Sequence, residues 1–242
     1  MLSIHFDKNI EWWVSDKTFE RLFQFALDNS LITQDLAHMR DVVEANGGFD
    51  FTLEDNHEAL TIRQGLQQAA QLELQRLVDI DQESEDVTYQ LSLRKLLEEF
   101  FDQFLMIMDD QLEYLADQAA SLGIKLDFSL DDCDKVEQLF DKMSLGKNKD
   151  EVKDLIILFA RHVGEMVRNN YGGNWTLPLS DVININFNSP VIVGHTTIEG
   201  LEFAPISLMR AYSLRPKKGM IITAIDAQVN HNIIDLSDLI EE

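Results

Sequence analysis

The chain has 242 residues, of which 45% are hydrophobic and 26% are charged. This composition is sufficient for a hydrophobic core and excludes an intrinsically disordered chain. The formal net charge of −23 disfavours direct binding to nucleic acid or to an anionic membrane, because both would be repelled, and it favours encounter with a basic protein.

The chain contains one cysteine, Cys133, which excludes an intrachain disulfide and a cysteine-based zinc knuckle and fits a reducing compartment. Carboxylates on both sides of Cys133 predict a raised thiol pKa and an unreactive thiol. The first residues lack the basic and apolar segments of a signal peptide, and no run reaches the roughly 18 apolar residues of a membrane span. We therefore expect a cytoplasmic protein.

The negative charge is concentrated in the first two thirds of the chain. Residues 1–160 contain 34 acidic and 14 basic side chains, whereas residues 161–242 contain 9 and 6. Two explanations remain open: the charge steers a basic partner toward the protein, or it only keeps the protein soluble.

The first part of the sequence predicts a series of helices. Residues 15–30, 33–46 and 56–80 place apolar side chains three and four positions apart, which is the helical spacing. The acidic segment 79–86 has carboxylates at alternating positions, but it lacks the glycine and the glutamate that an EF-hand requires at its sixth and twelfth positions. We therefore expect a loop between helices at this segment.

Helical periodicity continues through residues 87–123, with a break expected near 108–110. A further helix is predicted at 128–143, where Ser129 and Asp132 have the spacing of a capping box. The polar segment that follows, residues 144–151, is the best candidate for a linker.

After this segment the sequence predicts a long helix at 151–173 and then short strands joined by tight turns. A helix at 204–214 follows, with a proline in its first turn. The predicted fold is α+β, with an acidic, mostly helical region at 1–146 and a small mixed region with a short antiparallel sheet at 147–242. The strand candidates are rich in β-branched residues and comprise residues 175–179, 181–187, 190–195 and 196–200.

One pair of residues in the long helix suggests chemistry. His162 and Glu165 are three positions apart, so their side chains are expected on the same side of the helix, close enough to share a metal or a proton. The sequence contains no second Glu-x-x-His helix, which a di-iron bundle needs, and no G-x-S-x-G elbow. A metal-dependent hydrolase that uses this pair, with His195 from the strand region, is an alternative hypothesis.

Two adjacent tryptophans, Trp12 and Trp13, precede the first predicted helix. Consecutive residues of a strand point to opposite faces, so one indole is expected in the core and the other on the surface. A surface tryptophan is a typical anchor of a protein interface, although packing against a neighbouring helix explains a tryptophan equally well.

The segment HVGEMVRNNYGGNW, residues 162–175, ends the long helix. Gly172 or Gly173 is expected to adopt the positive φ of a helix C-cap, because glycine tolerates that conformation without steric cost. Trp175 is expected to start the sheet and to cover the core.

The same segment resembles part of a group of uncharacterised bacterial domains, some of them from toxin–immunity loci. In these domains a helix with a G-E pair is followed by a G-G-x-W turn, short strands and a helix that starts at proline. The resemblance covers roughly residues 150–215 and implies a bacterial protein that binds another protein, without supplying catalytic residues. The matching positions are Gly164, Glu165, Gly172, Gly173, Trp175 and Pro205.

Charge and resemblance together predict a non-enzymatic acidic bacterial protein that binds and neutralises a basic protein, as an immunity protein does for a secreted toxin. We expect no cofactor and no metal. A DNA mimic, whose carboxylates occupy a nucleic-acid-binding protein, is a further alternative. The candidate partner-binding residues are two tryptophans and a set of acidic residues: Trp12, Trp13, Asp79, Asp81, Glu83, Glu85, Asp86, Asp109, Asp110, Asp131, Asp132 and Asp134.

Overall fold

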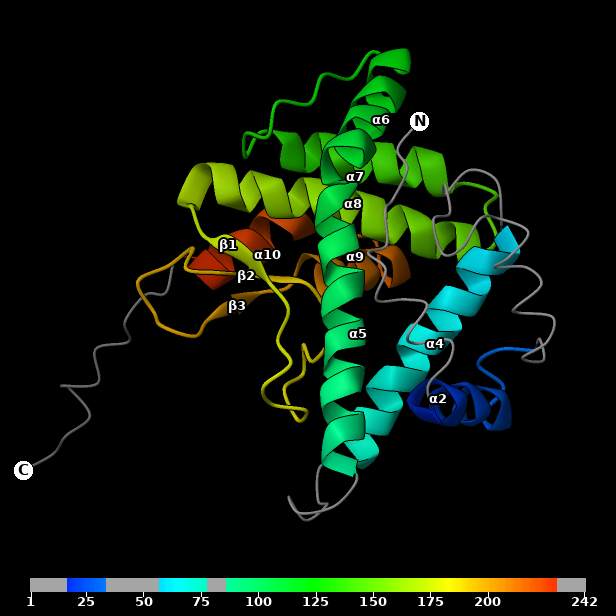
Figure 1. Ribbon diagram of the computed structural model, residues 1–242. Coiled ribbons are helices and arrows are strands. Elements are labelled where there is room, and N and C mark those ends of the chain that lie inside the picture. Colours follow the sequence, from blue (N-terminus) through cyan, green and yellow to red (C-terminus); the bar gives the residue numbers. More distant parts are fainter. Residues whose placement is uncertain (1–16, 34–56, 78–85, 230–242) are drawn as a thin grey trace, which may run out of the picture. The chain divides into compact units, whose positions relative to one another are not determined.

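The computed structural model describes residues 17–33, 57–77 and 86–229 (Figure 1). Three short strands, β1 (Asn174–Thr176), β2 (Val191–Val193) and β3 (Glu202–Phe203), form an antiparallel sheet in that order. The described part of the chain is α+β and mostly helical, as the sequence predicts. The helices are α2 (Lys17–Asp28), α4 (His57–Arg76), α5 (Asp86–Met106), α6 (Met108–Ser121), α7 (Asp132–Ser144), α8 (Lys149–Tyr171), α9 (Pro205–Leu214) and α10 (Met220–Val229).

A row of buried side chains crosses the sheet. Trp175 of β1 is paired with Ile192 of β2, which is paired with Phe203 of β3, and all three side chains are buried. Because successive residues of a strand alternate between faces, this row fixes which face of the sheet meets the core. The strands predicted at 175–179 and 190–195 are confirmed in shortened form, because β1 overlaps the start of the first and β2 lies within the second.

The chain divides into two compact units, with a boundary between residues 106 and 107. Of the described elements, the first unit contains α2, α4, α5 and residues 179–188, and the second contains α6 to α10 and the sheet. This division differs from the predicted one at 146 and 147, because α6 and α7 both pack against α8. The predicted break in the helix at 87–123 falls at Ile107, between α5 and α6.

The segment predicted as a linker, residues 144–151, is a short connection between two packed helices. Asn148 caps α8, since its side chain accepts hydrogen bonds from the backbone N–H groups of Asp150 and Glu151 at 2.9 and 3.0 Å. The Glu151 carboxylate in turn accepts a hydrogen bond from the Asn148 N–H at 2.9 Å. This reciprocal capping box fixes the start of α8, so the connection belongs to the fold of the second unit.

The capping box predicted at Ser129 is wrong. Asp131 is the N-cap of α7, and its side chain makes no capping hydrogen bond. The carboxylate of Asp132 points inward instead and accepts hydrogen bonds from the backbone N–H groups of Asp127 and Phe128, at 2.7 and 2.9 Å.

In the first unit, α2 and α5 both pack against α4. The helices predicted at 15–30 and 56–80 are confirmed as α2 and α4 over the residues that the structure describes, and the one predicted at 33–46 lies outside them from residue 34 on. Gly65 lets the chain after α2 lie directly on α4, because a Cβ at this position would be 2.4 Å from a methyl group of Ile32. The core of this unit includes Leu22, Phe23, Ala26, Leu66, Ala69, Ala70, Leu74, Leu93 and Leu97.

Residues 183–187 alternate between apolar and polar side chains, yet the segment 181–187 forms turns and no strand. The side chains of Asp181 and Asn184 accept hydrogen bonds from the backbone N–H groups two residues later, at 3.0 and 2.8 Å, which folds the backbone locally. Ile183 and Ile185 are therefore left 85% and 95% exposed. The strand predicted at this segment is wrong.

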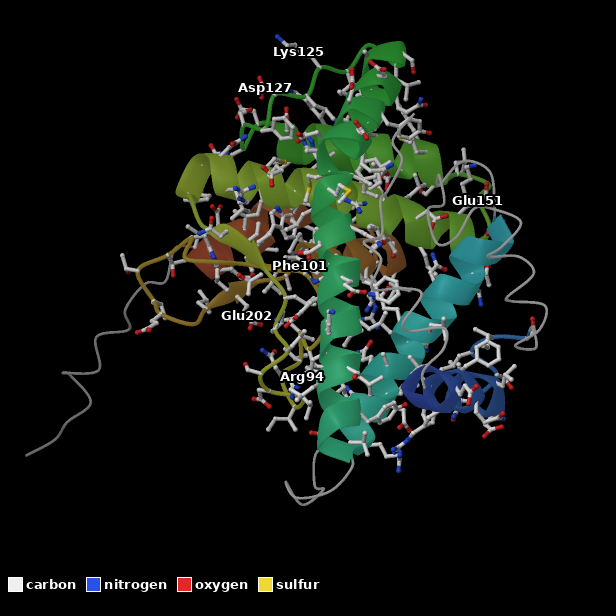
Figure 2. The ribbon with its side chains drawn as sticks, viewed as in Figure 1. Arg94, Phe101, Lys125, Asp127, Glu151 and Glu202 are labelled. Carbon is white, nitrogen blue, oxygen red and sulfur yellow. The ribbon has the colours of Figure 1, made fainter. Side chains whose placement is uncertain are left out.

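The ends of this segment are fixed within the first unit. The guanidinium of Arg94 on α5, labelled in Figure 2, donates a hydrogen bond to the carbonyl of Leu179. At the other end Phe187 is buried, and the Asn188 side chain donates to Gln71 of α4 at 3.5 Å.

Helix α8 is central to the second unit, where it contacts α6, α7, α9 and β2. In Figure 1 it lies between α7 above it and α9 below it. The predicted helix at 204–214 is confirmed as α9, with Pro205 at its start, whereas the strand predicted at 196–200 is a run of bends and turns. The buried positions of α8 are Ile156, Leu158, Phe159, Ala160, Arg161, His162, Val163, Gly164, Met166 and Val167.

Candidate functional site

The G-E and G-G-x-W parts of the sequence meet where α8 ends and β1 begins. Gly164 makes this meeting possible, because a Cβ at its position would lie 2.2 and 2.4 Å from two carbons of the Trp175 indole. The indole therefore packs directly on the backbone of α8. We call Gly164, Glu165, Arg168, Gly173 and Trp175 the α8–β1 corner.

Glu165 connects the polar groups of this corner. The indole N–H of Trp175 donates a hydrogen bond to Glu165 Oε1 at 2.7 Å, and Arg168 Nη1 donates to the same oxygen at 2.7 Å. Arg168 also donates through Nε to the carbonyl of Gly173 at 3.3 Å. Half-buried and buried polar groups need such partners, so the Glu165 carboxylate orients the indole that covers the core.

The two glycines of this segment have different roles. Gly172 has a φ of +81°, and its N–H ends α8 by donating to the carbonyl of Arg168, with open space around it. Gly173 has a φ of +94°, and a Cβ there would lie 2.6 Å from the carbonyl oxygen of Val193 on β2. Gly173 is therefore needed for close packing as well as for its backbone conformation.

His162 has a partner of its own on α7. Its Nε2 lies 3.4 Å from Oδ2 of Asp132, and the exposed fractions of the two side chains are 2% and 0%. The ring of Phe128 stacks on the imidazole, with 4.6 Å between ring centroids. The hypothesis that His162 and Glu165 share a metal or a proton is not supported by this geometry, because each side chain is engaged by different residues.

The Asp132 carboxylate holds together several parts of the second unit. Besides two backbone N–H groups it accepts a hydrogen bond from the Lys135 ammonium at 2.7 Å. Burial by itself would raise the pKa of Asp132, whereas the imidazole of His162 and the ammonium of Lys135 lower it. With the two backbone hydrogen bonds, they hold the pKa of this carboxyl well below its usual range.

The described residues contain no group of three or more His, Cys, Asp or Glu side chains that could hold a metal ion. His195, proposed as a third member of a metal site, is buried after β2 and lies edge-on to the Phe203 ring, with centroids 6.0 Å apart. The hypothesis of a metal-dependent hydrolase thus has no assembled donor set in the ranges that the structure describes.

Cys133 is a buried, unreactive thiol. It is 2% exposed, and burial raises its pKa to about 12, with the charges of Glu137 and Asp132 adding to this effect. A thiol that stays protonated at neutral pH is a poor nucleophile, in agreement with its carboxylate-rich sequence context.

Helix α6 exposes carboxylates that the fold does not use. Asp109, Asp110, Glu113 and Asp117 are exposed, and none of them forms an ion pair with another described residue. Tyr114, 50% exposed, is a neighbour of Asp110 and Asp117 on the helix surface, because residues three and four apart adjoin one another. We call these five residues the acidic face.

The acidic residues that the sequence suggests for partner binding differ in their exposure. Asp109 and Asp110 belong to the acidic face, and Asp131 and Asp134 are exposed at the start of α7. Asp132 is a correction: it is fully buried and bonded within the fold, so it is not accessible to a partner. Asp86 is the first residue of α5. The remaining candidates lie outside the described residues: Trp12, Trp13, Asp79, Asp81, Glu83 and Glu85.

Sequence reasoning missed three members of the acidic face, Glu113, Tyr114 and Asp117. A signal for them exists, because residues 96–124 contain seven Asp or Glu and no Lys or Arg. Helical spacing then places Glu113 and Asp117 one and two turns after Asp109. A search for stretches without compensating charge would have found the face.

No protein-family model, no curated protein and no solved structure matches this chain. The resemblance of residues 150–215 to bacterial domains from toxin–immunity loci therefore stays a prediction. Among the helices in the described ranges, none is both long enough and apolar enough to cross a membrane.

Proposed function

We propose that this chain is a non-enzymatic binding protein that holds a basic protein partner on the acidic face of α6. The observation that supports this proposal is the set of four exposed carboxylates without ion partners among the described residues. The carboxylate of Asp132, by contrast, is buried and bonded within the fold. The carboxylates of the acidic face form no ion pair with the described residues, so their charge is available to a partner.

Electrostatic attraction would raise the rate of association with the basic partner, and Tyr114 would add to the contact area. A net charge of −23 attracts a basic protein over a distance and can raise the association rate by about 10- to 1,000-fold at low salt. Surface ion pairs contribute little affinity individually, about 0.2–1 kcal/mol each. An exposed tyrosine between carboxylates adds the kind of aromatic anchor that is frequent at interface hot spots.

The resemblance to domains of toxin–immunity loci makes the proposal more specific. It implies that the basic partner is a secreted toxin and that binding neutralises it. A partner that normally binds nucleic acid would instead indicate a DNA mimic. The identity of the partner decides between these two forms of the proposal, and both require the acidic face.

The experiment compares three immobilised proteins as baits for lysate of the native host. They are the unchanged chain, an acidic-face variant (D109N/D110N/E113Q/D117N), and a control (E20Q/D28N/E98Q/D102N) that removes four exposed charges from α2 and α5. The two variants have the same net charge, so a difference between them reports on the place of the charges. The captured protein is then purified and its association rate with each bait is measured.

We expect the unchanged chain and the control to capture one basic protein that the acidic-face variant loses. Its association rate should fall at least about tenfold between about 50 mM and about 500 mM salt, as the Debye length shortens. A salt-independent rate, an acidic captured protein, or equal loss in the two variants would refute the proposal.

A further inference from the structure

The turn between α9 and α10 has the opposite charge to the rest of the molecule. Residues 204–225 contain four Lys or Arg and no Asp or Glu, in a chain with 43 acidic residues. All four cations are exposed, and Leu214 beside them is 76% exposed. We call Arg210, Leu214, Arg215, Lys217 and Lys218 the basic face.

Helical spacing brings the first part of this face together. Arg210 and Leu214 are four positions apart on α9, so they adjoin each other on its surface. Arg215 follows the last residue of the helix, and its backbone N–H donates to the carbonyls of Ala211 and Tyr212, at 3.1 and 3.2 Å. Arg210 on α9 and Arg215 directly after it are therefore held by an ordered helix end.

Two carboxylates of α7 hold the turn from its inner side. Glu137, which is buried, accepts hydrogen bonds from the backbone N–H groups of Gly219 and Ile221, at 2.8 and 2.9 Å. Asp141 accepts a hydrogen bond from the Tyr212 hydroxyl at 3.2 Å. A turn fixed in this way loses little conformational freedom when it binds a partner.

The cations themselves are not used by the fold. None of the four forms an ion pair with any residue in the described ranges. A basic, partly apolar and pre-ordered surface has the features of a docking site for an acidic surface. The acidic face of α6 has the complementary composition, with four carboxylates and an exposed tyrosine against four cations and an exposed leucine.

We propose that the basic face of one copy of this chain docks on the acidic face of a second copy. In Figure 1, α6 extends above α8 and α9 lies below it, so the helix of the acidic face and the helix at which the basic face begins lie on opposite sides of α8. The contact joins two different surfaces, which makes it heterologous and lets it continue from copy to copy. This inference goes beyond the proposed function, although a basic partner on the acidic face would compete with it.

Two electrostatic effects oppose each other in this association. Copies with a net charge of −23 repel each other over a long range, which dominates at about 0.01 M salt, where the Debye length is about 30 Å. At about 0.15 M salt that length is about 8 Å, so distant charges are screened while the two docked faces still attract. At about 1 M salt the attraction between the faces is screened as well, so association is greatest at the intermediate salt concentration.

Sedimentation velocity tests this with the full chain and two charge-reversed variants. One variant reverses the basic face (R215E/K217E/K218E), and the other reverses the acidic face (D109K/E113K/D117K). A control (K125E/K142E/K149E) reverses three exposed lysines of the same unit outside the basic face. Far-ultraviolet circular dichroism of each variant establishes that it is folded.

We expect the unchanged chain and the control to associate with increasing concentration at about 0.15 M salt, and less at about 0.01 M and about 1 M. Each reversed variant alone should lose association by at least about tenfold, because like charges then face each other. Mixing the two reversed variants should restore it, since each then offers the charge that the other needs. This rescue cannot be explained by misfolding of either variant.

Three results would overturn the inference. They are an unchanged chain that stays monomeric up to about 1 mM at all three salt concentrations, reversed variants that associate as the control does, and a mixture that remains monomeric. Association that only increases with salt would also overturn it, because that dependence is typical of an apolar contact.

Discussion

The α8–β1 corner and the acidic face of α6 both contain carboxylates, but they use them in opposite ways. Glu165 in the corner bonds to an indole and a guanidinium, both at 2.7 Å. The carboxylates of α6 are exposed and have no ion partner among the described residues. Burial decides this difference, since a buried charge without partners would cost several kcal/mol, whereas an exposed one is solvated.

Asp132 resembles Glu165 of the corner, although the acidic residues beside it in the sequence are exposed. Asp131, Asp132 and Asp134 are almost contiguous, and only the middle one is buried. Its partners are the imidazole of His162, the ammonium of Lys135 and two backbone N–H groups. Acidic residues that are equivalent in the sequence therefore divide into one that holds the fold and others that are free to meet a partner.

The largest expected effect is that of Asp132→Ala. Removing one partner from a buried charged network costs about 3–5 kcal/mol, because the buried imidazole of His162 and two backbone N–H groups lose their acceptor. The matched control is Asp131→Ala, which removes an exposed carboxylate with no capping hydrogen bond and should change the free energy of unfolding by less than about 0.5 kcal/mol. Urea denaturation measures both values, and similar losses in the two variants would contradict the assigned role of Asp132.

The same carboxyl gives this prediction a pH dependence. Its pKa is lowered in the folded chain and is about 3.9 in an unfolded one, so the unfolded state binds more protons in acid. The stability that Asp132 contributes is fully present above about pH 4 and is lost as the pH falls toward the folded-state pKa. Between about pH 5 and pH 3 the unchanged chain should therefore lose stability more steeply than Asp132→Asn does.

The two glycines that follow α8, Gly172 and Gly173, provide the next largest effect. Gly173→Ala forces a Cβ into the left-handed region, which costs about 1–2 kcal/mol, and places it 2.6 Å from the Val193 carbonyl oxygen, which adds about 1–3 kcal/mol of overpacking. Gly172→Ala has a backbone cost only, about 1–3 kcal/mol for a φ of +81° with a ψ of −158°, because nothing lies within 4 Å of its Cβ. Thermal or urea unfolding should rank the variants in this order, and equal losses would show that the Val193 contact is not limiting.

The sequence predicted the regular elements better than the connections between them. The helical spacing of apolar residues identified α2, α4 and α8, and a proline in the first turn identified α9. The turns at 181–187 were not predicted, since their alternation fits a strand equally well. Two features distinguish this segment from a strand, its Asx turns and its exposed isoleucines. Both arise because no described strand pairs with the segment, and the local sequence does not reveal this.

The candidate site was predictable to the extent that it is local. The sequence indicated that positive φ values end α8 and that Trp175 begins the sheet, because both follow from nearby glycines. It did not indicate that His162 faces Asp132, which is 30 positions earlier and meets it only through the packing of α7 on α8. The helical spacing of His162 and Glu165 suggested a shared site, whereas tertiary contacts engage them with different partners.

Neutralising the acidic face is expected to have the smallest effect on the free energy of unfolding. It tests the exposed carboxylates in the comparison, as Asp132→Ala tests the buried one. The variant D109N/D110N/E113Q/D117N removes the repulsion between Asp109, Glu113 and Asp117. This repulsion costs about 0.2–0.5 kcal/mol for each pair that lies one turn apart. The favourable interaction of Asp109 and Asp110 with the start of α6, about 0.3–1 kcal/mol each at low salt, is lost. These contributions have opposite signs and similar sizes, so the free energy of unfolding should change by less than about 1 kcal/mol while partner binding is lost. A large loss of stability would mean that these carboxylates hold the fold after all, as Asp132 does, and their exposure would no longer argue for a binding role.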